Sequence, residues 1–401
     1  MKRRDFLRLA AGSGVAAFES FPGAADLAKI RITRVSGFRH TGPRPKLVGK
    51  NSHLDVHGSE TRDSVLRIET DQGIEGIGSG NVTPYLAWQL LGHALAEYWN
   101  PAQGIVSPLG RADHALYDLV AKALGVPAWK LLGGAGPEWV PVYDGGIYFN
   151  DLLPEHATRG VGRLLDEIDE SLKEGHRAFK IKVGRGYKWM ETSAGFKRDV
   201  EVVQAIRRRV GRDIRLMVDA NNGFDLDTTK RWLDTAGDEL FFIEEMFPEV
   251  VEQDLELKSF LRSKGWKTLV ADGESAREIA HFDPFVAGEA IDVLQPDIRA
   301  FGLTLQWELS RRIAPKPGIR LAPHNWGSFL GLYMQLQLAR GIPNFLMAEQ
   351  DRSRSELFDM SQYTFKEGRI RVPAVPGCGI AIREDIFRRR YRDSAWAVSA
   401  G

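Results

Sequence analysis

The sequence lacks features that define several classes of protein: paired cysteines, long apolar runs and an excess of one charge. Its single cysteine, Cys378, excludes an intrachain disulfide and any zinc or iron–sulfur site built on cysteine. No apolar run reaches the ~18 residues that span a bilayer, so stable membrane insertion is not expected. The 54 Lys and Arg residues balance 53 Asp and Glu, and no block of like charge occurs. Nucleic acid is therefore not an expected partner.

The size and composition indicate a globular protein with more than one core. The chain has 401 residues, 43% of them hydrophobic and 27% charged. A single hydrophobic core usually stops growing at ~250–300 residues. We therefore expect one large barrel with a smaller domain, or two medium domains.

Residues 1–25 have the layout of an export signal. A basic start containing Arg3 and Arg4 precedes Phe6 and a short apolar stretch, which resembles the twin-arginine signal of bacteria. We predict a periplasmic or otherwise exported protein. The alternative is a basic amphipathic surface helix on a cytoplasmic protein.

Residues 26–138 are predicted to form an α+β domain. Strand patterns at residues 30–38, 64–70 and 74–80 indicate an antiparallel meander. Residues 85–132 are predicted to be helical, and a double glycine ends that region.

Short apolar runs with polar ends recur through residues 139–350, at intervals of 23 to 30 residues along most of this region. The runs are at residues 139–146, 179–183, 215–221, 240–245, 268–274, 292–298, 319–324 and 345–349. Parallel strands with this period close into a barrel more readily than they form an open sheet. The tail, residues 351–401, is irregular and is expected to pack back on the first domain.

Charged groups stand at the ends of these runs, where the loops of a parallel barrel converge on one mouth. They are Lys180, Lys182, Asp219, Asn221, Glu244, Glu245, Glu274, Asp297, His324 and Glu349. Barrel layers are otherwise filled by Val, Ile and Leu. The series therefore predicts an active site.

Asp219, Glu244 and Glu274 end neighbouring strands and carry hard oxygen donors without a soft ligand. This set suits Mg²⁺, one ion per subunit, completed by water or substrate oxygens. The alternative, in which each acid pairs with a Lys or Arg at the rim, leaves three adjacent acids to repel one another.

Basic groups lie on both sides of these acids in strand order. Lys182 ends the second strand and His324 the seventh, so they are placed to approach a substrate from opposite faces. Asp297, one strand before His324, is placed to bond its imidazole and raise its basicity. Taken alone, His324 could equally be a histidine of the core whose hydrogen bonds are satisfied.

The ordered motifs K-I-K, V-D-A-N, I-E-E, D-G-E, Q-P-D, A-P-H and M-A-E resemble the enolase superfamily, in particular its mandelate racemase subgroup. The resemblance covers roughly residues 29–390. It implies an α/β fold: a (β/α)7β TIM-like barrel with an α+β capping domain, made by the N-terminal region and residues 351–401. The related muconate-lactonizing subgroup places a lysine on the sixth strand, where this chain has Asp297 and Arg299.

The resemblance also implies roles for the strand-end residues. Asp219, Glu244 and Glu274 correspond to the metal ligands and Lys182 to one base. His324 with Asp297 corresponds to the family's dyad. The resemblance further makes Glu349 an acid that hydrogen-bonds a developing enediolate, and Lys180 a contact of the substrate carboxylate. Asn221 and Asn325, judged from their positions alone, contact the substrate or the residues that bind it, or alternatively are helix caps.

This chemistry removes the proton α to a carboxylate and stabilises the enediolate that forms. Residues 39–60 have no periodicity and are predicted to be a lid loop, in which Arg44, Lys46, His53 and His57 read hydroxyls or a distal carboxylate. We predict dehydration of an aldonic or aldaric acid sugar to a 2-keto-3-deoxy acid. Racemisation or epimerisation of a 2-hydroxy acid is the alternative, and a non-catalytic acid-sugar binding protein a remote one.

The expected partners are accordingly a small-molecule carboxylate substrate and further copies of the chain in a homo-oligomer.

Overall fold

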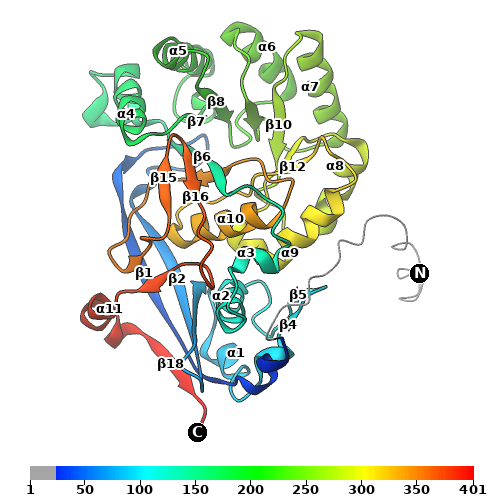
Figure 1. Ribbon diagram of the computed structural model, residues 1–401. Helices are drawn as coiled ribbons and strands as arrows, with labels where there is room; N and C mark the ends of the chain where they lie inside the picture. The colour runs from blue at the N-terminus through cyan, green and yellow to red at the C-terminus, as the bar shows by residue number, and fades with distance from the viewer. Residues whose placement is uncertain (1–23) are drawn as a thin grey trace.

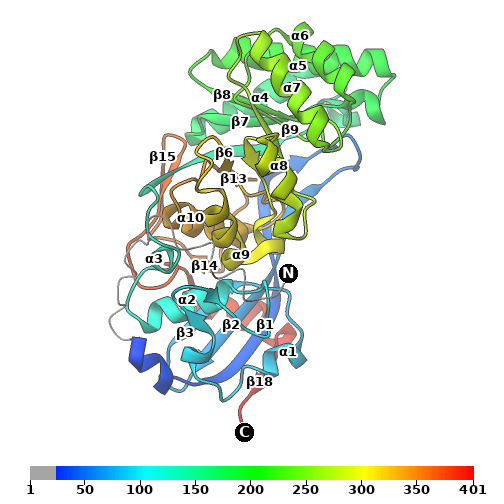
Figure 2. The same ribbon diagram turned by 90° about the vertical axis from the view of Figure 1, so that its right-hand side faces the viewer.

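The computed structural model describes residues 24–401. The export signal predicted for residues 1–25 therefore falls almost entirely outside the described residues. Figures 1 and 2 show a barrel surrounded by helices, with a twisted antiparallel sheet beneath it that leads to the C-terminus.

The capping domain is built on an antiparallel sheet of order β18-β1-β2-β3. Its strands are β1 (Ile32–Val48), β2 (Gly58–Thr70), β3 (Glu75–Ser79) and β18 (Trp396–Ser399). The last strand pairs with β1, so the end of the chain returns to the sheet where the described chain begins.

The lid loop predicted for residues 39–60 is wrong over most of its length. The pairing of β1 with β2 continues from Arg39 opposite Ser64 to Val48 opposite Gly58, which leaves residues 49–57 as the loop. The inward positions of this stretch are His40, Gly42 and Arg44. Because polar residues occupy the buried face, the strand has no hydrophobic alternation to reveal it.

The helical prediction for residues 85–132 is correct only in parts. The structure has α1 (Pro84–Trp88), α2 (His114–Ala123) and α3 (Ala128–Leu131), with a short hairpin of β4 (Trp99–Asn100) and β5 (Gly104–Ile105) between the first two. Helix α2 packs directly on β3. A Cβ atom on Gly76 would lie 2.2 Å from the Ala115 carbonyl oxygen, so this approach needs a glycine.

The barrel strands follow the predicted runs and confirm the fold class. They are β6 (Trp139–Ile147), β7 (Ala178–Lys182), β8 (Arg215–Asp219), β9 (Phe242–Glu244), β10 (Leu269–Asp272), β11 (Val293–Leu294), β12 (Arg320–Leu321) and β13 (Ala348–Gln350). Neighbours pair in parallel from β6 to β12, and β13 pairs with β6. Leu321 in β12 exchanges backbone hydrogen bonds with Asn344 and Leu346 just before β13, which closes the ring.

A helix follows each barrel strand from β6 to β12. The helices are α4 (Val161–Glu174), α5 (Thr192–Val210), α6 (Leu226–Ala236), α7 (Val251–Ser263), α8 (Asp283–Gly288), α9 (Ile298–Ile313) and α10 (Phe329–Gly341). Among residues 24–401, none of the helices combines the length and apolar character that crossing a bilayer requires.

The tail after the barrel contacts both parts of the molecule. It contains β14 (Phe358–Asp359), β15 (Thr364–Lys366), β16 (Arg369–Arg371), β17 (Ala381–Ile382) and α11 (Glu384–Arg390). Strand β16 adds to the barrel strand β6, whereas β18 adds to the capping sheet. Asp63 of β2 also accepts the backbone N–H of Phe329 at the start of α10, at 3.0 Å. The hairpin formed by β1, β2 and the loop of residues 49–57, here called the capping hairpin, is thus bound at the barrel mouth.

Candidate active site

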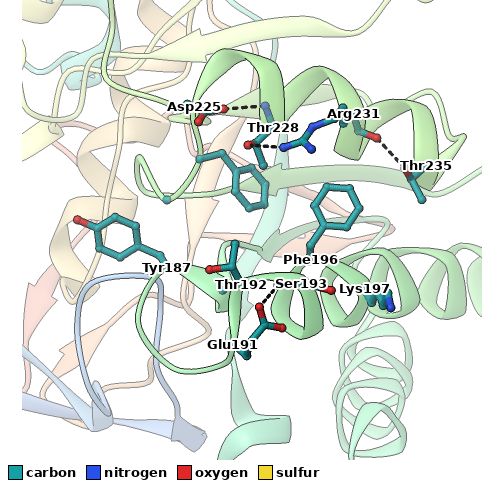
Figure 3. Close-up of a pocket in the computed structure, with 13 residues that line it drawn as sticks. Tyr187, Glu191, Thr192, Ser193, Phe196, Lys197, Asp225, Thr228, Arg231 and Thr235 are labelled. Atoms are coloured by element: carbon teal, nitrogen blue, oxygen red, sulfur yellow. Dashed lines mark hydrogen bonds between the residues drawn. The ribbon is translucent and has the colours of Figure 1, made fainter.

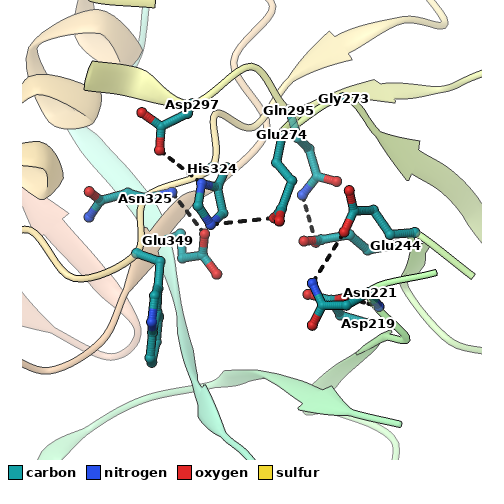
Figure 4. Close-up of polar contacts among 12 residues, drawn as sticks. Asp219, Asn221, Glu244, Gly273, Glu274, Gln295, Asp297, His324, Asn325 and Glu349 are labelled. Atoms are coloured by element: carbon teal, nitrogen blue, oxygen red, sulfur yellow. Dashed lines mark hydrogen bonds and ion pairs between the residues drawn. The ribbon is translucent and has the colours of Figure 1, made fainter. Parts of the chain in front are cut away.

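The charged strand ends predicted from the sequence gather at one end of the barrel (Figure 4). In the close-up, Glu274 points toward His324, and Asp219 and Glu244 lie across the opening from them. Asp219, Glu244 and Glu349 are buried, as are Lys180 and Lys182. Charges buried to this extent require close partners.

The two lysines of β7 provide those partners. Lys180 Nζ lies 2.6 Å from Glu244, 2.8 Å from Glu349 and 3.2 Å from Asp219. Lys182 Nζ donates to Asp219 at 2.5 Å and to the amide oxygen of Asn221 at 2.7 Å. Side chains pointing the same way from one strand thus bind acids from three other strands.

These pairings set the charge states of the cluster. Burial acts to raise the pKa of Asp219, but the ammonium groups of Lys182 and Lys180 hold that pKa well below its usual value. Burial also opposes charge on Lys182, yet Asp219 raises the pKa of Lys182 well above its usual value. For Glu244, burial and the neighbouring carboxylates raise the pKa well above the usual range against the effect of Lys180.

His324 and Asp297 lie together as the sequence predicted. His324 Nδ1 is 2.9 Å from Asp297 Oδ2, and its Nε2 is 3.4 Å from Glu274 Oε2. Burial opposes charge on the ring, but Glu274 and Asp297 together raise the pKa of His324 to about 10. These carboxylates favour the charged imidazolium, and Asp297 orients the ring at one nitrogen.

Glu349 is held as a carboxylate in this arrangement. Its Oε2 accepts the backbone N–H of Asn325 at 2.9 Å, and its Oε1 faces Lys180. Burial acts to raise the pKa of Glu349, but Lys180 and His324 lower it below its usual value. The side-chain amide of Asn325 donates to the Ser328 carbonyl at 3.2 Å, so Asn325 shapes the turn that precedes α10.

Backbone strain is concentrated next to this cluster. Asn221 and Glu245 have φ values of +43° and +41°, in the left-handed region that non-glycine residues seldom adopt. The amide of Asn221 donates to Glu245 Oε2 at 3.2 Å. Burial, with Glu274 and Asp219, raises the pKa of Glu245 to about 8. Strained residues at adjacent strand ends are typical of a functional site.

The three predicted metal ligands are not brought together as one ligand set. Within the described part of the chain, no group of three or more Asp, Glu, His or Cys side chains is arranged to hold a metal ion. Lys180 instead lies between Asp219 and Glu244, and Glu274 is turned toward His324. Asp219 and Glu244 are nevertheless close enough for one ammonium group to contact both.

The comparisons with known proteins place this arrangement in a family. Residues 163–386, more than half of the chain, match the model of the "Enolase C-terminal domain-like" family. The chain belongs to the enolase superfamily. The resemblance stated from the motifs is therefore confirmed.

Members of the superfamily with known structures superpose closely. A magnesium complex of a mutant galacturonate dehydratase from Geobacillus sp. has a TM-score of 0.87 at 30% identity, over 93% of this chain and 98% of that one. The same enzyme with D-galacturonate and 5-keto-4-deoxy-D-galacturonate gives a TM-score of 0.84 at 31% identity, over 92% and 99%. A D-galactarolactone cycloisomerase of Agrobacterium fabrum is 28% identical, over 74% of this chain and 77% of that protein.

Several residues of this enolase-superfamily site were missed in the sequence. Tyr148 follows β6 directly and is 3% exposed, with Lys182 Nζ 5.1 Å from its ring centroid. Trp326 stacks on Tyr148 at 4.7 Å, and Gln295 donates to Glu244 at 2.7 Å. In the sequence, Tyr148 cannot be distinguished from an aromatic residue of the core. Gln295 could have been identified, because it is the first residue of the Q-P-D motif at a strand end.

A sizeable cavity lies beside this centre rather than over it. Figure 3 shows this space of about 880 Å³ between α5 and α6, next to Tyr187 and Phe196. Some of its polar groups cap helices. Asp225, for example, accepts the backbone N–H of Thr228 at 2.7 Å at the start of α6. No predicted site residue lines it.

Proposed function

We propose that this protein is an acid-sugar dehydratase, a lyase that removes the proton α to a carboxylate and then expels the β-hydroxyl. The observation that carries the proposal is the His324–Asp297 pair, 2.9 Å apart, in the same ring of strand ends as Lys182. His324 as the acid and Lys182 as the potential base therefore lie at the same barrel mouth. The similarity to galacturonate dehydratase supports the same reaction class.

In the proposed reaction, Lys182 in its amine form takes the α-proton. The C–O bond at the β-carbon then breaks, and the imidazolium of His324 gives its proton to the departing hydroxyl, which leaves as water. The enol that remains becomes the 2-keto acid by tautomerisation. Lys180 lies where its charge counters that of the enediolate, and Asp297 keeps the imidazole in one orientation.

The donor set of Asp219, Glu244 and Glu274 fits Mg²⁺, because it offers only carboxylate oxygens. Burial raises the pKa of Glu244 most, and the neighbouring carboxylates of Asp219, Glu349 and Glu274 raise it further, so a cation at this point would stabilise the ionised acids. When bound, Mg²⁺ would supply a Lewis acid for the substrate carboxylate and engage the Asp219 charge that otherwise keeps Lys182 protonated. A structure of a mutant of the related galacturonate dehydratase holds magnesium, which supports this assignment.

The proposed substrates are six-carbon acid sugars such as D-galacturonate or the aldonates. A library of uronates, aldonates and aldarates, assayed with Mg²⁺ for 2-keto acid product, tests the function. Proton NMR in D₂O run alongside detects exchange at the α-carbon. Lys182→Ala and His324→Asn are expected to abolish product formation, and absence of product and of exchange with every member of the library would reject the proposal.

The alternative reaction is inversion at the α-carbon, as in a racemase or epimerase. A lysine and a histidine on opposite sides of the substrate would also permit it, and the relatives include an N-succinyl-L-Arg/Lys racemase from Bacillus cereus at 25% identity. Exchange with stereoinversion and without keto product would favour this alternative. A non-catalytic binding protein would exchange no proton.

Self-association is a further proposal. The homo-oligomer expected from the sequence can be checked by light scattering of the purified protein. A mass of one 44.8 kDa chain at working concentration would refute it.

A further inference from the structure

The tip of the capping hairpin contacts the residues that follow barrel strands β6 and β8, because Phe149 N–H donates to the Lys50 carbonyl and the Ser52 hydroxyl donates to the Ala220 carbonyl. A bound substrate would therefore turn the end remote from its reacting carboxylate toward this tip. The basic residues of the tip, residues 44–57, are Arg44, Lys46, Lys50, His53 and His57. A free cation among them would bind a second carboxylate. Their actual partners therefore decide which sugar acids fit.

Arg44 is already neutralised inside the protein. Its Nε lies 3.1 Å from Asp351 Oδ2, and each of the two side chains is 2% exposed. Its Nη1 donates to the Glu60 carbonyl at 2.8 Å, and the guanidinium lies over the ring of Trp326, 4.5 Å from the centroid. Arg44, which lies over the ring of Trp326, is thus already engaged in a buried ion pair with Asp351.

Both lysines of the hairpin are paired as well. Lys46 forms an ion pair with Glu167, whose side chain is fully buried. Lys50 lies 3.3 Å from Asp55, and its ammonium is 4.0 Å from the ring centroid of Trp189. Neither ammonium is available to a ligand without losing a protein partner.

His57 is held as a neutral hydrogen-bond partner of the backbone. His57 Nδ1 is 2.8 Å from the Gly49 carbonyl oxygen, and burial lowers the pKa of His57, with Lys182 acting in the same direction. His53 packs on Tyr187 with ring centroids 4.3 Å apart, at the outer edge of the loop. An imidazole that remains neutral offers hydrogen bonds to hydroxyls rather than charge.

The surface nearest to Lys182 on this side is aromatic. Tyr148 and Trp326 stack at 4.7 Å, and His57 packs edge-on against Tyr148 at 4.8 Å. On the barrel side, Arg299 donates to the Trp326 carbonyl at 2.9 Å and Arg277 to the Ala276 carbonyl at 2.8 Å. A carbon chain with hydroxyl groups can pack on such a wall, whereas Arg44, Lys46 and Lys50 of the hairpin already have carboxylate partners.

We infer that the site accepts sugar acids with a single carboxylate and an uncharged distal end, and that it discriminates against dicarboxylic sugar acids. The inference rests on the proposed function and narrows its substrate class to uronates and aldonates. A second carboxylate that binds Arg44 or Lys46 would have to displace Asp351 or Glu167 from a buried ion pair. That displacement is costly, because it leaves a buried charge without its partner.

The test compares substrates that differ only at the distal carbon. For a galacto-configured substrate these are D-galacturonate, its reduction product L-galactonate and its oxidation product galactarate, which share the reacting end. We expect kcat/KM for galactarate to be at least about tenfold below the better of the other two. A library hit of another configuration is compared with its own oxidised partner in the same way.

The outcomes separate this inference from the function on which it rests. Equal or preferred use of the dicarboxylate would overturn the inference and leave the dehydratase intact. No turnover of any acid sugar would reject the dehydratase itself. Preference for either monocarboxylate supports the inference.

A variant tests the role of Arg44 directly. Asp351→Asn removes the charge that neutralises Arg44 but keeps a side chain of the same size, so the ratio of kcat/KM for dicarboxylate over monocarboxylate should rise at least about fivefold. Asp359→Asn, in the same tail but away from Arg44, is the control and should leave the ratio unchanged. If Asp351→Asn does not fold, Glu167→Gln releases Lys46 for the same comparison. An unchanged ratio in a folded variant would overturn the assignment.

Discussion

His324 Nδ1 lies 2.9 Å from Asp297 Oδ2, and the two residues end neighbouring strands of the barrel. The same carboxylate caps helix α9, where its Oδ1 accepts the backbone N–H groups of Arg299 and Ala300 at 3.0 and 2.8 Å. Asp297 is thus fixed by the helix it starts, and it fixes the imidazole in turn. Burial would raise the pKa of Asp297, but its bond to His324 lowers it to about 2.

Replacing Asp297 with asparagine should lower kcat by about 100-fold, because the imidazole loses its orientation and its charge partner. Asp297 helps to raise the pKa of His324, so its removal lowers that pKa. If His324 acts as the acid, the alkaline limb of the kcat–pH profile should move to lower pH. Asp227→Asn, at an exposed position of α6, is the control. A large loss of kcat with an unmoved alkaline limb would show that Asp297 has only a structural role.

Tyr148 is expected to contact the substrate through its hydroxyl. Its ring is fixed by Trp326 and faces Lys182, and none of the hydrogen bonds found among residues 24–401 uses its oxygen. Tyr148→Phe keeps the stacking and should lower kcat/KM by about tenfold. Tyr143→Phe is a contrasting variant, because the Tyr143 hydroxyl is buried and has no hydrogen-bond partner among residues 24–401, so its loss should raise the melting temperature. Unchanged kinetics of Tyr148→Phe would exclude this contact.

The site was predictable where charge interrupts a regular pattern. In residues 215–219 an apolar strand ends in Asp219, and the β9 and β12 regions end in Glu244 and His324 in the same way. Because parallel strands must all end at the same face, local patterns sufficed to place these residues together. The prediction that Asp297 contacts His324 rested on strand order alone, and the structure shows the contact at 2.9 Å.

The capping hairpin and the partners of its cations were not predictable. Arg44 binds Asp351, 307 residues away, and Lys46 binds Glu167, 121 residues away. No local pattern connects such pairs. Arg44 and Lys46 can be buried in β1 because these ion pairs neutralise their charges. In the sequence alone the partners are unknown, so a strand with charged residues on its buried face resembles a loop.

Export by the twin-arginine route remains a prediction from residues 1–25. Replacing Arg3 and Arg4 with lysine keeps the positive charge and removes the guanidinium pair, so the precursor should accumulate in the cytoplasm of a bacterial host. Replacing Lys2 with arginine is the matched control and should not affect export. The readout is fractionation followed by immunoblotting. Cytoplasmic location of the unaltered protein would favour the surface-helix alternative.

Metal dependence follows from the acids around Lys180. Chelation should abolish activity and Mg²⁺ should restore it, and Mg²⁺ should also raise the melting temperature, because an ion that binds only the folded state stabilises it. Asp219→Asn and Glu244→Gln should lose both effects, whereas Glu252→Gln, at an exposed position of α7, should retain them. A melting temperature that responds equally in all variants would place the ion elsewhere. Full activity after exhaustive chelation would refute metal dependence.

His114, the first residue of α2, should make the capping domain sensitive to acid. Its side chain is fully buried, Nδ1 accepts the backbone N–H of Ser79 at 3.1 Å, and Nε2 has no partner among the described residues. Burial lowers the pKa of His114 to about 3, whereas an unfolded chain returns it to about 6.5. The unfolded state therefore binds the proton more readily between these values, and stability is lost as the pH falls from about 6.5 to about 3, by an amount on the order of 5 kcal/mol. Asn in place of His114 can still accept from Ser79 but cannot titrate, so His114→Asn should be less stable at pH 7 and lose less stability on acidification. Urea unfolding at several pH values measures both, and parallel stability–pH curves for the two proteins would show that His114 is not the group responsible.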